Sequence, residues 1–174
     1  RKPNAREKLA LPLVTAAQDS AAAGLKAILT KAREQMIADG LTQLAYVNDP
    51  NAIAIEFPAV MLGELTASVA TAFNDGRETA QAELGGSTKA LRTLATIVGL
   101  LAQILRHTLT NQVKARLVSI FSRHLLRTGD EAEAVKLTQT EMRDESLVYL
   151  DELAQGVGFQ AVAEGRGYEF DNNA

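Results

Sequence analysis

Helical periodicity dominates the chain, and its longest run lies between glycine turns at residues 88–128. Apolar residues in this run recur at alternating intervals of three and four, which is the spacing of a heptad seam. The seam begins with Leu91, Leu94, Val98, Leu101 and Leu105, and the apolar face continues through Leu109, Val113, Leu117, Ile120, Phe121 and Leu125. A helix of 41 residues spans about 60 Å. The pattern therefore predicts an all-α fold, an extended helical bundle with one very long central helix, for which Thr108–Asn111 mark a potential break.

Helical spacing also covers the first half of the chain. Residues 5–39 are rich in alanine and predict one amphipathic helix or two that abut. Pro12 is expected to start or kink the first piece, and Gly40 to end the second. Residues 59–84 predict another helix, whose apolar face is Val60, Leu62, Leu65, Val69, Ala72 and Phe73.

Residues 41–58 separate these helices. Asn48-Asp49-Pro50-Asn51 is a turn signature. Residues 52–57 predict a short extended piece or a loop over the core, and Pro58 suits the first position of the next helix. Because aromatic residues make up only 5% of the chain and Trp is absent, the core must be built from Ala, Leu, Val and Ile.

Two shorter helices are expected after the long one. Asp130, with Glu133 three residues later, is typical of a capping box and predicts a short helix to about Met142. A further helix is expected over about residues 145–163, which would place Asp144 and Glu145 at its positive dipole end.

The end of the chain breaks the helical pattern. Gly156 and Gly158 weaken the last helix but would permit close packing. Residues 168–171 alternate polar and apolar side chains and predict a terminal β-strand. The start at Arg1 and this unfinished strand lead us to expect a piece of a longer protein. The expected organisation is an N-terminal helical arm over 1–86 and a second part over 87–174, or one continuous domain.

Charge is segregated along the chain, although the formal net charge is only −3. Residues 87–129 hold seven basic and no acidic side chains, whereas residues 130–174 hold 3 basic and 11 acidic ones. Arg116, Arg123 and Arg127 share one stripe of the long helix, and Lys114 is offset from it. The stripe either packs against the acidic segment or faces an external anion such as DNA or an acidic protein. We favour local neutralisation because a short loop joins the two segments.

Few residues of the chain are candidates for catalysis or metal binding. The absence of cysteine excludes disulfides, thiolate metal sites and a cysteine nucleophile. His107 and His124 are seventeen residues apart on the long helix. They would lie about 25 Å apart along an unbroken helix and could not share a metal ion. We predict surface or interface histidines, and no catalytic residue, metal site or cofactor. The uncharged run Thr93–Leu105 is too short for a membrane span, which needs roughly 20 residues, so no membrane is expected.

The second half of the chain resembles a known family. Residues 127–134 read Arg-Thr-Gly-Asp-Glu-Ala-Glu-Ala, Asp144-Glu145-Ser146 follow, and the alanine-rich helix ends at Gly165-Arg166. This pattern, over about residues 88–170, resembles the minor head, or head-morphogenesis (Mu F-like), proteins of tailed bacteriophages. Their pattern is a helix, a turn into a short helix, and an alanine-rich helix that ends in Gly-Arg before a β-hairpin.

The resemblance implies a non-enzymatic virion protein near the portal vertex, assembled in the host cytoplasm. Its partners would be portal or capsid proteins in a multi-chain assembly, and the basic stripe would face an acidic partner or packaged DNA. One alternative is a free-standing bacterial helical bundle that self-associates through the seam at 91–105. Another is a helical enzyme whose polar residues converge only in three dimensions.

Overall fold

The computed structural model describes residues 5–84 and 91–171, and the side chains of 15–79 and 95–166. The elements in chain order are α1 (Ala5–Leu44), the 3-10 turn η1 (Pro50–Ala52), α2 (Ala59–Leu84), α3 (Leu91–Thr128), α4 (Glu131–Asp144) and α5 (Val148–Asp171). Within these ranges no residue lies in a β-strand, so the all-α prediction is confirmed.

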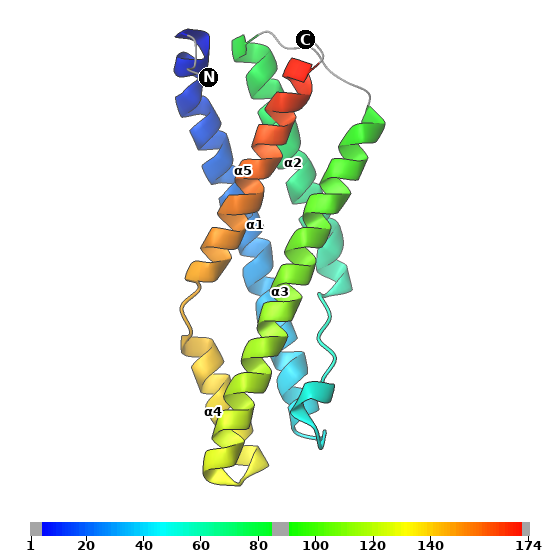
Figure 1. The fold of residues 1–174 in the computed structure, drawn as a ribbon, viewed down its shortest axis with the longest axis vertical. Helices are drawn as coiled ribbons and strands as arrows, with labels where there is room; N and C mark the ends of the chain where they lie inside the picture. Colours follow the sequence, from blue (N-terminus) through cyan, green and yellow to red (C-terminus); the bar gives the residue numbers. More distant parts are fainter. Residues whose placement is uncertain (1–4, 85–90, 172–174) are drawn as a thin grey trace.

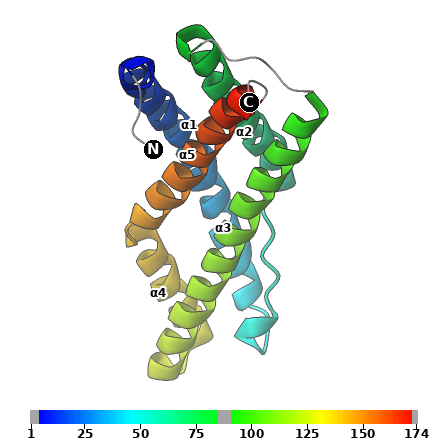
Figure 2. The same cartoon turned by 45° about the horizontal axis from the view of Figure 1, so that its top comes forward.

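The helices form an elongated bundle of four rods (Figure 1). α1 and α3 run downward in this view, whereas α2 runs upward, and α4 followed by α5 makes the fourth, ascending rod. α5 packs on α1 and α2 over the upper half, while α4 packs on α3 at the lower end. The rotated view keeps the same neighbours (Figure 2).

The core is aliphatic, as the composition requires, with Phe73 and Phe121 among its largest buried side chains. In α3 the seam residues Val98, Leu101 and Leu105 are buried, while the side chains of Leu91 and Leu94 lie outside the described residues. The continuation of this face is buried at Leu109, Val113, Leu117, Ile120 and Phe121. In α2 the predicted face holds except at Val60, which is 79% exposed.

The lengths of α1 and α3 test the prediction of one very long helix. α3 is continuous over 38 residues, so the long helix forms without the potential break at Thr108–Asn111. α1 has 40 residues, so the bundle contains two long helices rather than a single long central one. Pro12 and Gly40 both lie inside α1. An added Cβ at Gly40 would lie 2.5 Å from Leu117 Cδ1 and 2.9 Å from Ile55 Cδ1. Gly40 therefore serves close packing and does not end the helix.

The segment between α1 and α2 is an extended cover over the core, as predicted. Ile53, Ile55 and Phe57 are buried at alternate positions. The Gln43 side chain donates to Ala54 O and accepts from Ala54 N, both at 2.8 Å. This paired contact satisfies backbone groups that no strand neighbour satisfies.

Two glycines bring α2 and α5 into backbone contact. A Cβ at Gly76 would overlap the carbonyl of Val162, and a Cβ at Gly165 would overlap the carbonyl of Phe73. The contact is reciprocal. Gly76 touches Val162, three residues before Gly165, and Gly165 touches Phe73, three residues before Gly76. Gly158 approaches α1 as well, since its Cβ would lie 3.2 Å from Ala22 N.

In the C-terminal third, the structure confirms the predicted start of α4 and corrects the predicted start and end of the last helix. Asp130 caps α4 by accepting from the amides of Ala132 and Glu133, and Gly129 precedes it at a φ of 66°. α5 begins at Val148, so Asp144 and Glu145 lie at the end of α4 and not at a helix start. The expected strand at 168–171 is wrong, because α5 continues to Asp171. Extending an existing helix satisfies each added residue locally, whereas a strand needs a partner edge.

Candidate functional site at the junction of α1, α3 and α4

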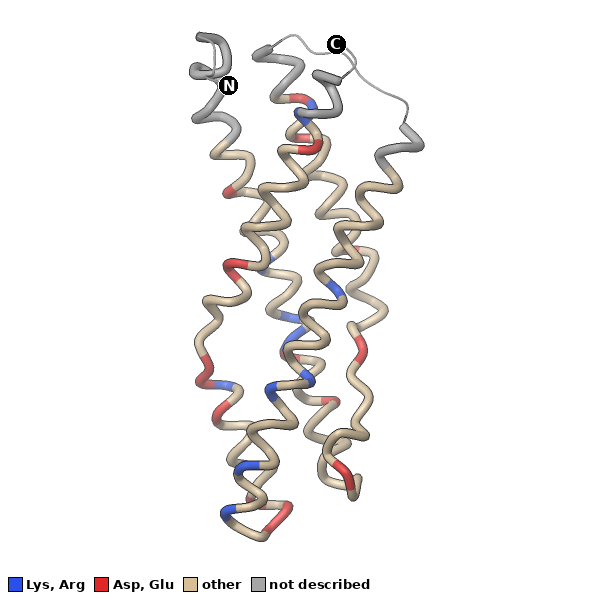
Figure 3. Tube along the Cα trace, viewed as in Figure 1, with Lys and Arg blue, Asp and Glu red and all other residues tan. Residues whose placement is uncertain are grey.

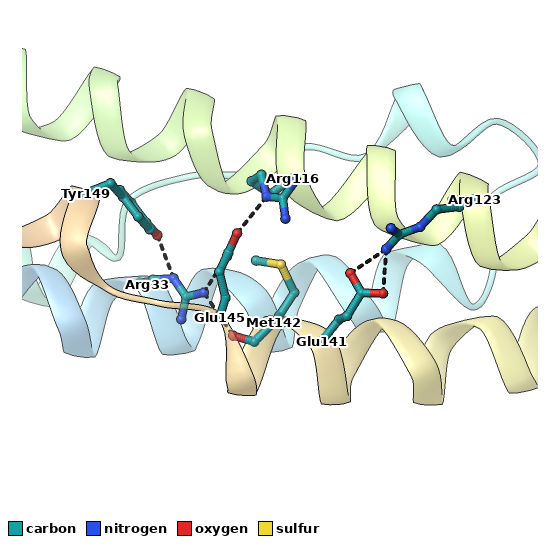
Figure 4. Close-up of polar contacts among 7 residues, drawn as sticks. All are labelled: Arg33, Arg116, Arg123, Glu141, Met142, Glu145 and Tyr149. Carbon is teal, nitrogen blue, oxygen red and sulfur yellow. Dashed lines mark hydrogen bonds and ion pairs between the residues drawn. The ribbon is translucent and has the colours of Figure 1, made fainter.

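Arg33 is a buried cation in the middle of α1, with 6% of its side chain exposed. It lies on the core-facing side of α1, between the buried residues Ala32 and Met36. Its Nε donates to Tyr149 Oη at 2.6 Å, and its Nη2 donates to Met142 O at 3.0 Å (Figure 4). The guanidinium carbon also lies 6.0 Å from the centre of the Tyr149 ring.

Glu145 joins Arg33 to a second arginine. Its Oε2 accepts from Arg33 Nη2 at 2.9 Å, and its Oε1 accepts from Arg116 Nε at 2.7 Å (Figure 4). The carboxylate is only 18% exposed, whereas Arg116 is 51% exposed. We call Arg33, Arg116, Glu145 and Tyr149 the Glu145 clamp. Because buried charges are costly unless they are paired, the clamp ties α1, α3 and the end of α4 to one another.

Tyr149 completes this cluster at the start of α5. Burial raises the pKa of its phenol above the usual value, although the charge and hydrogen bond of Arg33 oppose the rise. The hydroxyl therefore stays protonated near neutral pH, and its oxygen accepts the Arg33 hydrogen bond.

A second polar cluster lies nearer the lower end of α3 and α4. Arg123 Nη2 pairs with both carboxylate oxygens of Glu141 (Figure 4). His124 Nε2 lies 2.8 Å from Glu141 Oε1, and Arg127 Nη2 lies 2.9 Å from His124 Nδ1. Arginine nitrogens only donate, so His124 Nδ1 is the acceptor and Nε2 donates to Glu141. Desolvation alone would raise the pKa of Glu141, but the hydrogen bonds of Arg123 and His124 and the charge of Arg123 outweigh it and hold that pKa below its usual value.

The predicted basic stripe is brought together with the acidic segment. Figure 3 shows the Lys and Arg positions of lower α3 beside the Asp and Glu positions of α4 and of the α4–α5 connection. Arg116 and Arg123 form ion pairs with Glu145 and Glu141, and Arg127 donates to His124. Lys114 is half-buried beside them. Local neutralisation, the interpretation we favoured, thus describes Arg116 and Arg123, and contact with an external anion stays a prediction.

The remaining predicted residues fall elsewhere. Gly165 lies at the α2–α5 crossing, far along α5 from the clamp, and Arg166 beside it is half-buried. His107 is exposed, while His124 is buried at the α3–α4 interface, as the interface prediction allowed.

Sequence reasoning missed Arg33, Glu141 and Tyr149, and it placed Glu145 only at a helix start. A usable signal was present, because Arg33 lies at core spacing among Leu29, Ala32 and Met36. A charged residue on an apolar face requires a buried partner. The identity of that partner was hidden, since Glu145 and Tyr149 are more than a hundred residues away.

The clamp is flanked by two shallow hollows. One, of about 310 Å³, is lined by Gln112, Ala115, Arg116, Glu145 and Tyr149. The other, of about 370 Å³, lies between α1 and α4 beside Arg33 and Met142. Over the described residues, no three His, Asp or Glu side chains are placed to hold a metal ion. None of the helices in this part of the chain combines the length and apolar character of a membrane span.

Comparison of this chain with family models, with curated proteins and with solved structures gives no match.

Proposed function

We propose that the chain is a non-enzymatic structural component of a tailed-phage head, docked on the portal or the inner capsid of the virion. The resemblance over residues 88–170 is the source of this proposal. The Gly129 turn, the Asp130 cap and the 14-residue helix α4 support it, because the resemblance implies a turn into a short helix at this point. α5 departs from the family pattern by continuing as a helix past Gly165 and Arg166.

The Glu145 clamp is the observation that carries a structural role. Its charged groups are directed at one another across three helices, with N–O distances of 2.7 and 2.9 Å. Polar groups that satisfy each other inside a bundle specify one arrangement of the helices. A helical bundle with one fixed arrangement of its helices has a fixed shape, which suits a protein that sets the distance between its assembly partners.

Charge pairing also bears on the choice of partner. Arg116 and Arg123 already neutralise Glu145 and Glu141, although each guanidinium is more than half exposed and keeps further N–H donors. A DNA phosphate bound to either arginine would lie beside the paired carboxylate, and the repulsion between the two negative groups would oppose binding. We therefore propose portal or capsid protein, and not packaged DNA, as the main contact.

Co-expression with the portal protein of the same genome tests this assignment. We expect the chain to co-elute with the portal oligomer in size-exclusion chromatography and to be detected in purified virions by mass spectrometry. Elution apart from the portal oligomer, together with absence from virions, would overturn the assignment. An unrelated portal oligomer of similar size serves as the control for non-specific association.

Exposed leucine and isoleucine on α3 favour a second candidate, a self-associating helical module. Leu100 and Ile104 are 62% and 41% exposed, although they lie in the uncharged run 93–105. The buried seam at Val98, Leu101 and Leu105 already packs inside the chain, so within the described part of the 91–105 run this exposed pair is what a second copy could contact.

Sedimentation velocity of the isolated chain tests the second candidate. An oligomer that dissociates in the double variant Leu100→Glu/Ile104→Glu would support it. The matched control is Ala67→Glu/Thr71→Glu, which adds two charges at the same spacing on exposed positions of α2. A monomer at all concentrations would exclude it.

A further inference from the structure

α5 carries an exposed aromatic ring with a hollow on either side. Phe159 is 58% exposed near the middle of the helix. The hollow shared with α1 has a volume of about 510 Å³ and is lined by Gln18, Asp19, Glu152, Gln155, Gly156 and Phe159. The hollow on the other side has a volume of about 400 Å³ and is lined by Gly156, Phe159, Gln160, Ala163 and Glu164. We call these two hollows and the ring between them the Phe159 groove.

Glycine shapes this groove. Both hollows include Gly156, and a Cβ added there would meet no atom within 4 Å. Gly76 and Gly165, by contrast, have no room for a side chain because a neighbouring helix touches them. The missing side chain at Gly156 is therefore not required by packing within the chain, and it leaves the flank of the Phe159 ring open to an incoming side chain.

The charged side chains that line the groove all have one sign, and Lys26 in the adjoining hollow is paired with Asp151. The lining of the groove contains the exposed carboxylates Asp19, Glu152 and Glu164 and no Lys or Arg. No ion pair links these three carboxylates to another side chain in the described part of the chain, unlike Asp151, which pairs with Lys26 at 2.7 Å. A neighbouring acidic residue is thus neutralised internally, while the groove keeps its negative charge.

We propose that the Phe159 groove docks a cationic amphipathic segment of a partner protein. An apolar residue of that segment would insert beside Phe159, over Gly156, and its Lys or Arg side chains would pair with the three carboxylates. Exposed aromatic rings in a hollow are the usual anchors of such interfaces, and opposite charge at the rim selects the partner and speeds association. Nucleic acid is excluded as the occupant because the carboxylates repel phosphate. The inference is independent of the phage assignment, since any basic helix of suitable pattern would fit.

Fluorescence anisotropy on the full chain tests the proposal, with a labelled helical peptide of Leu and Lys as the probe. We expect saturable binding that weakens with salt, and about tenfold weaker binding by Phe159→Ala. Asp19→Asn/Glu152→Gln/Glu164→Gln should weaken binding to a similar extent and reduce its salt dependence. Gly156→Gln should weaken binding without removing the ring, because it fills the hollow.

Two controls separate the groove from general charge attraction. The first is Glu34→Gln/Asp39→Asn/Glu131→Gln, which removes the same charge from exposed positions outside the groove. The second is a peptide with Glu in place of Lys. The proposal is overturned if the Lys peptide fails to bind at about 100 μM, if Phe159→Ala binds it as tightly as the wild type, or if the control triple variant weakens binding equally. A failed portal co-elution with intact peptide binding would reject the proposed function alone.

Discussion

Two interfaces of this bundle hold helices together by opposite means. At the α2–α5 crossing, Gly76 and Gly165 remove side chains, and the backbones themselves touch. Where α1, α3 and α4 meet, long side chains span the interface, and Arg33, Arg116 and Glu145 carry it. At the α2–α5 crossing, an added side-chain atom would overlap the backbone of the other helix. At the Glu145 clamp, removal of one charged side chain would leave its partner without a counter-charge.

This difference explains why the two interfaces occupy different parts of the bundle. The crossing lies in the upper half, where α5 packs on α1 and α2, and the Glu145 clamp lies below it, where the chain passes from α4 to α5. Dispersion requires contact over many atoms, which parallel helix faces supply. A short connection offers few such contacts, so hydrogen-bonded charges fix its position instead.

The largest loss of stability is expected from Glu145→Ala. It leaves the Arg33 guanidinium buried without its carboxylate, and removing one partner of a buried pair costs about 3 kcal/mol. Urea denaturation followed by circular dichroism measures the change. The control is Asp144→Ala, because the neighbouring pair of Asp144 with Arg143 is exposed at 66% and 72% and such pairs contribute less than about 1 kcal/mol.

A double replacement sharpens this test. Arg33→Met with Glu145→Met removes both buried charges, and apolar replacement of a buried pair is often close to neutral. We expect the double variant to regain most of the stability lost in Glu145→Ala. Equal losses in Glu145→Ala and Asp144→Ala would show that the clamp contributes no more than a surface pair.

Gly165→Ala is expected to have the next largest effect. Its Cβ would overlap the carbonyl oxygen of Phe73, and overpacking of this kind costs about 2 kcal/mol. Gly156→Ala is the matched control on the same helix and meets open space. It should stabilise the chain by about 0.5 kcal/mol, since alanine favours the helix. The comparison fails if both substitutions shift the urea midpoint in the same direction.

A smaller loss is expected from Asp130→Ala. Its Oδ1 accepts from the amides of Ala132 and Glu133 at 3.0 and 3.3 Å, and loss of such a cap costs about 1 kcal/mol. Hydrogen exchange should locate the effect in α4 and leave the α2–α5 crossing protected. Uniform loss of protection would contradict the separation of the two interfaces.

The smallest effect is expected at low pH, where Glu141 becomes protonated. The pKa of Glu141 is held below its ordinary value of 4.5. Its contribution to stability is therefore present above the pKa of the unfolded chain and is lost as pH falls through the lower folded value. Because Glu141 is 38% exposed, we expect less than about 1 kcal/mol. Thermal unfolding between pH 6 and pH 3 should show a shallower decline in Glu141→Gln than in the wild type, and parallel declines would refute this role.

The local sequence pattern predicted most of the helices correctly, but it predicted the ends of helices and the contacts between them poorly. The α2 range, the Asp130 cap and the buried face of α3 followed from spacing and from capping chemistry, which act over a few residues. The predictions at Gly40 and at residues 168–171 were wrong for different reasons. Tertiary packing overrides the glycine stop at Gly40, whereas residues 168–171 extend an existing helix, which outweighs a four-residue alternation with no partner edge. Gly40 is buried against Leu117, a contact that no short-range signal contains.

The candidate site, too, was predicted only in part from the sequence. The chain predicted a basic stripe on α3 and an acidic segment after it, and their proximity through a short loop favoured pairing. Spacing could not indicate that Arg33 of α1 would share Glu145 with Arg116. That contact depends on α5 starting at Val148, which leaves Glu145 in the connection and free to turn inward.

By itself, the sequence determined a cysteine-free, aliphatic, all-α chain with segregated charge, because helical periodicity and composition are properties of neighbouring residues. Only the tertiary structure decided which charges are neutralised and which stay exposed. Arg116 and Glu145 are 29 residues apart and become partners because the turn at Gly129 folds α4 back on α3. Among the described residues, Asp19, Glu152 and Glu164 form no ion pair around Phe159. The packing of α5 on α1 brings Asp19 to Glu152 in a hollow with no Lys or Arg in its lining, and Glu164 lies further along α5 on the other side of the ring.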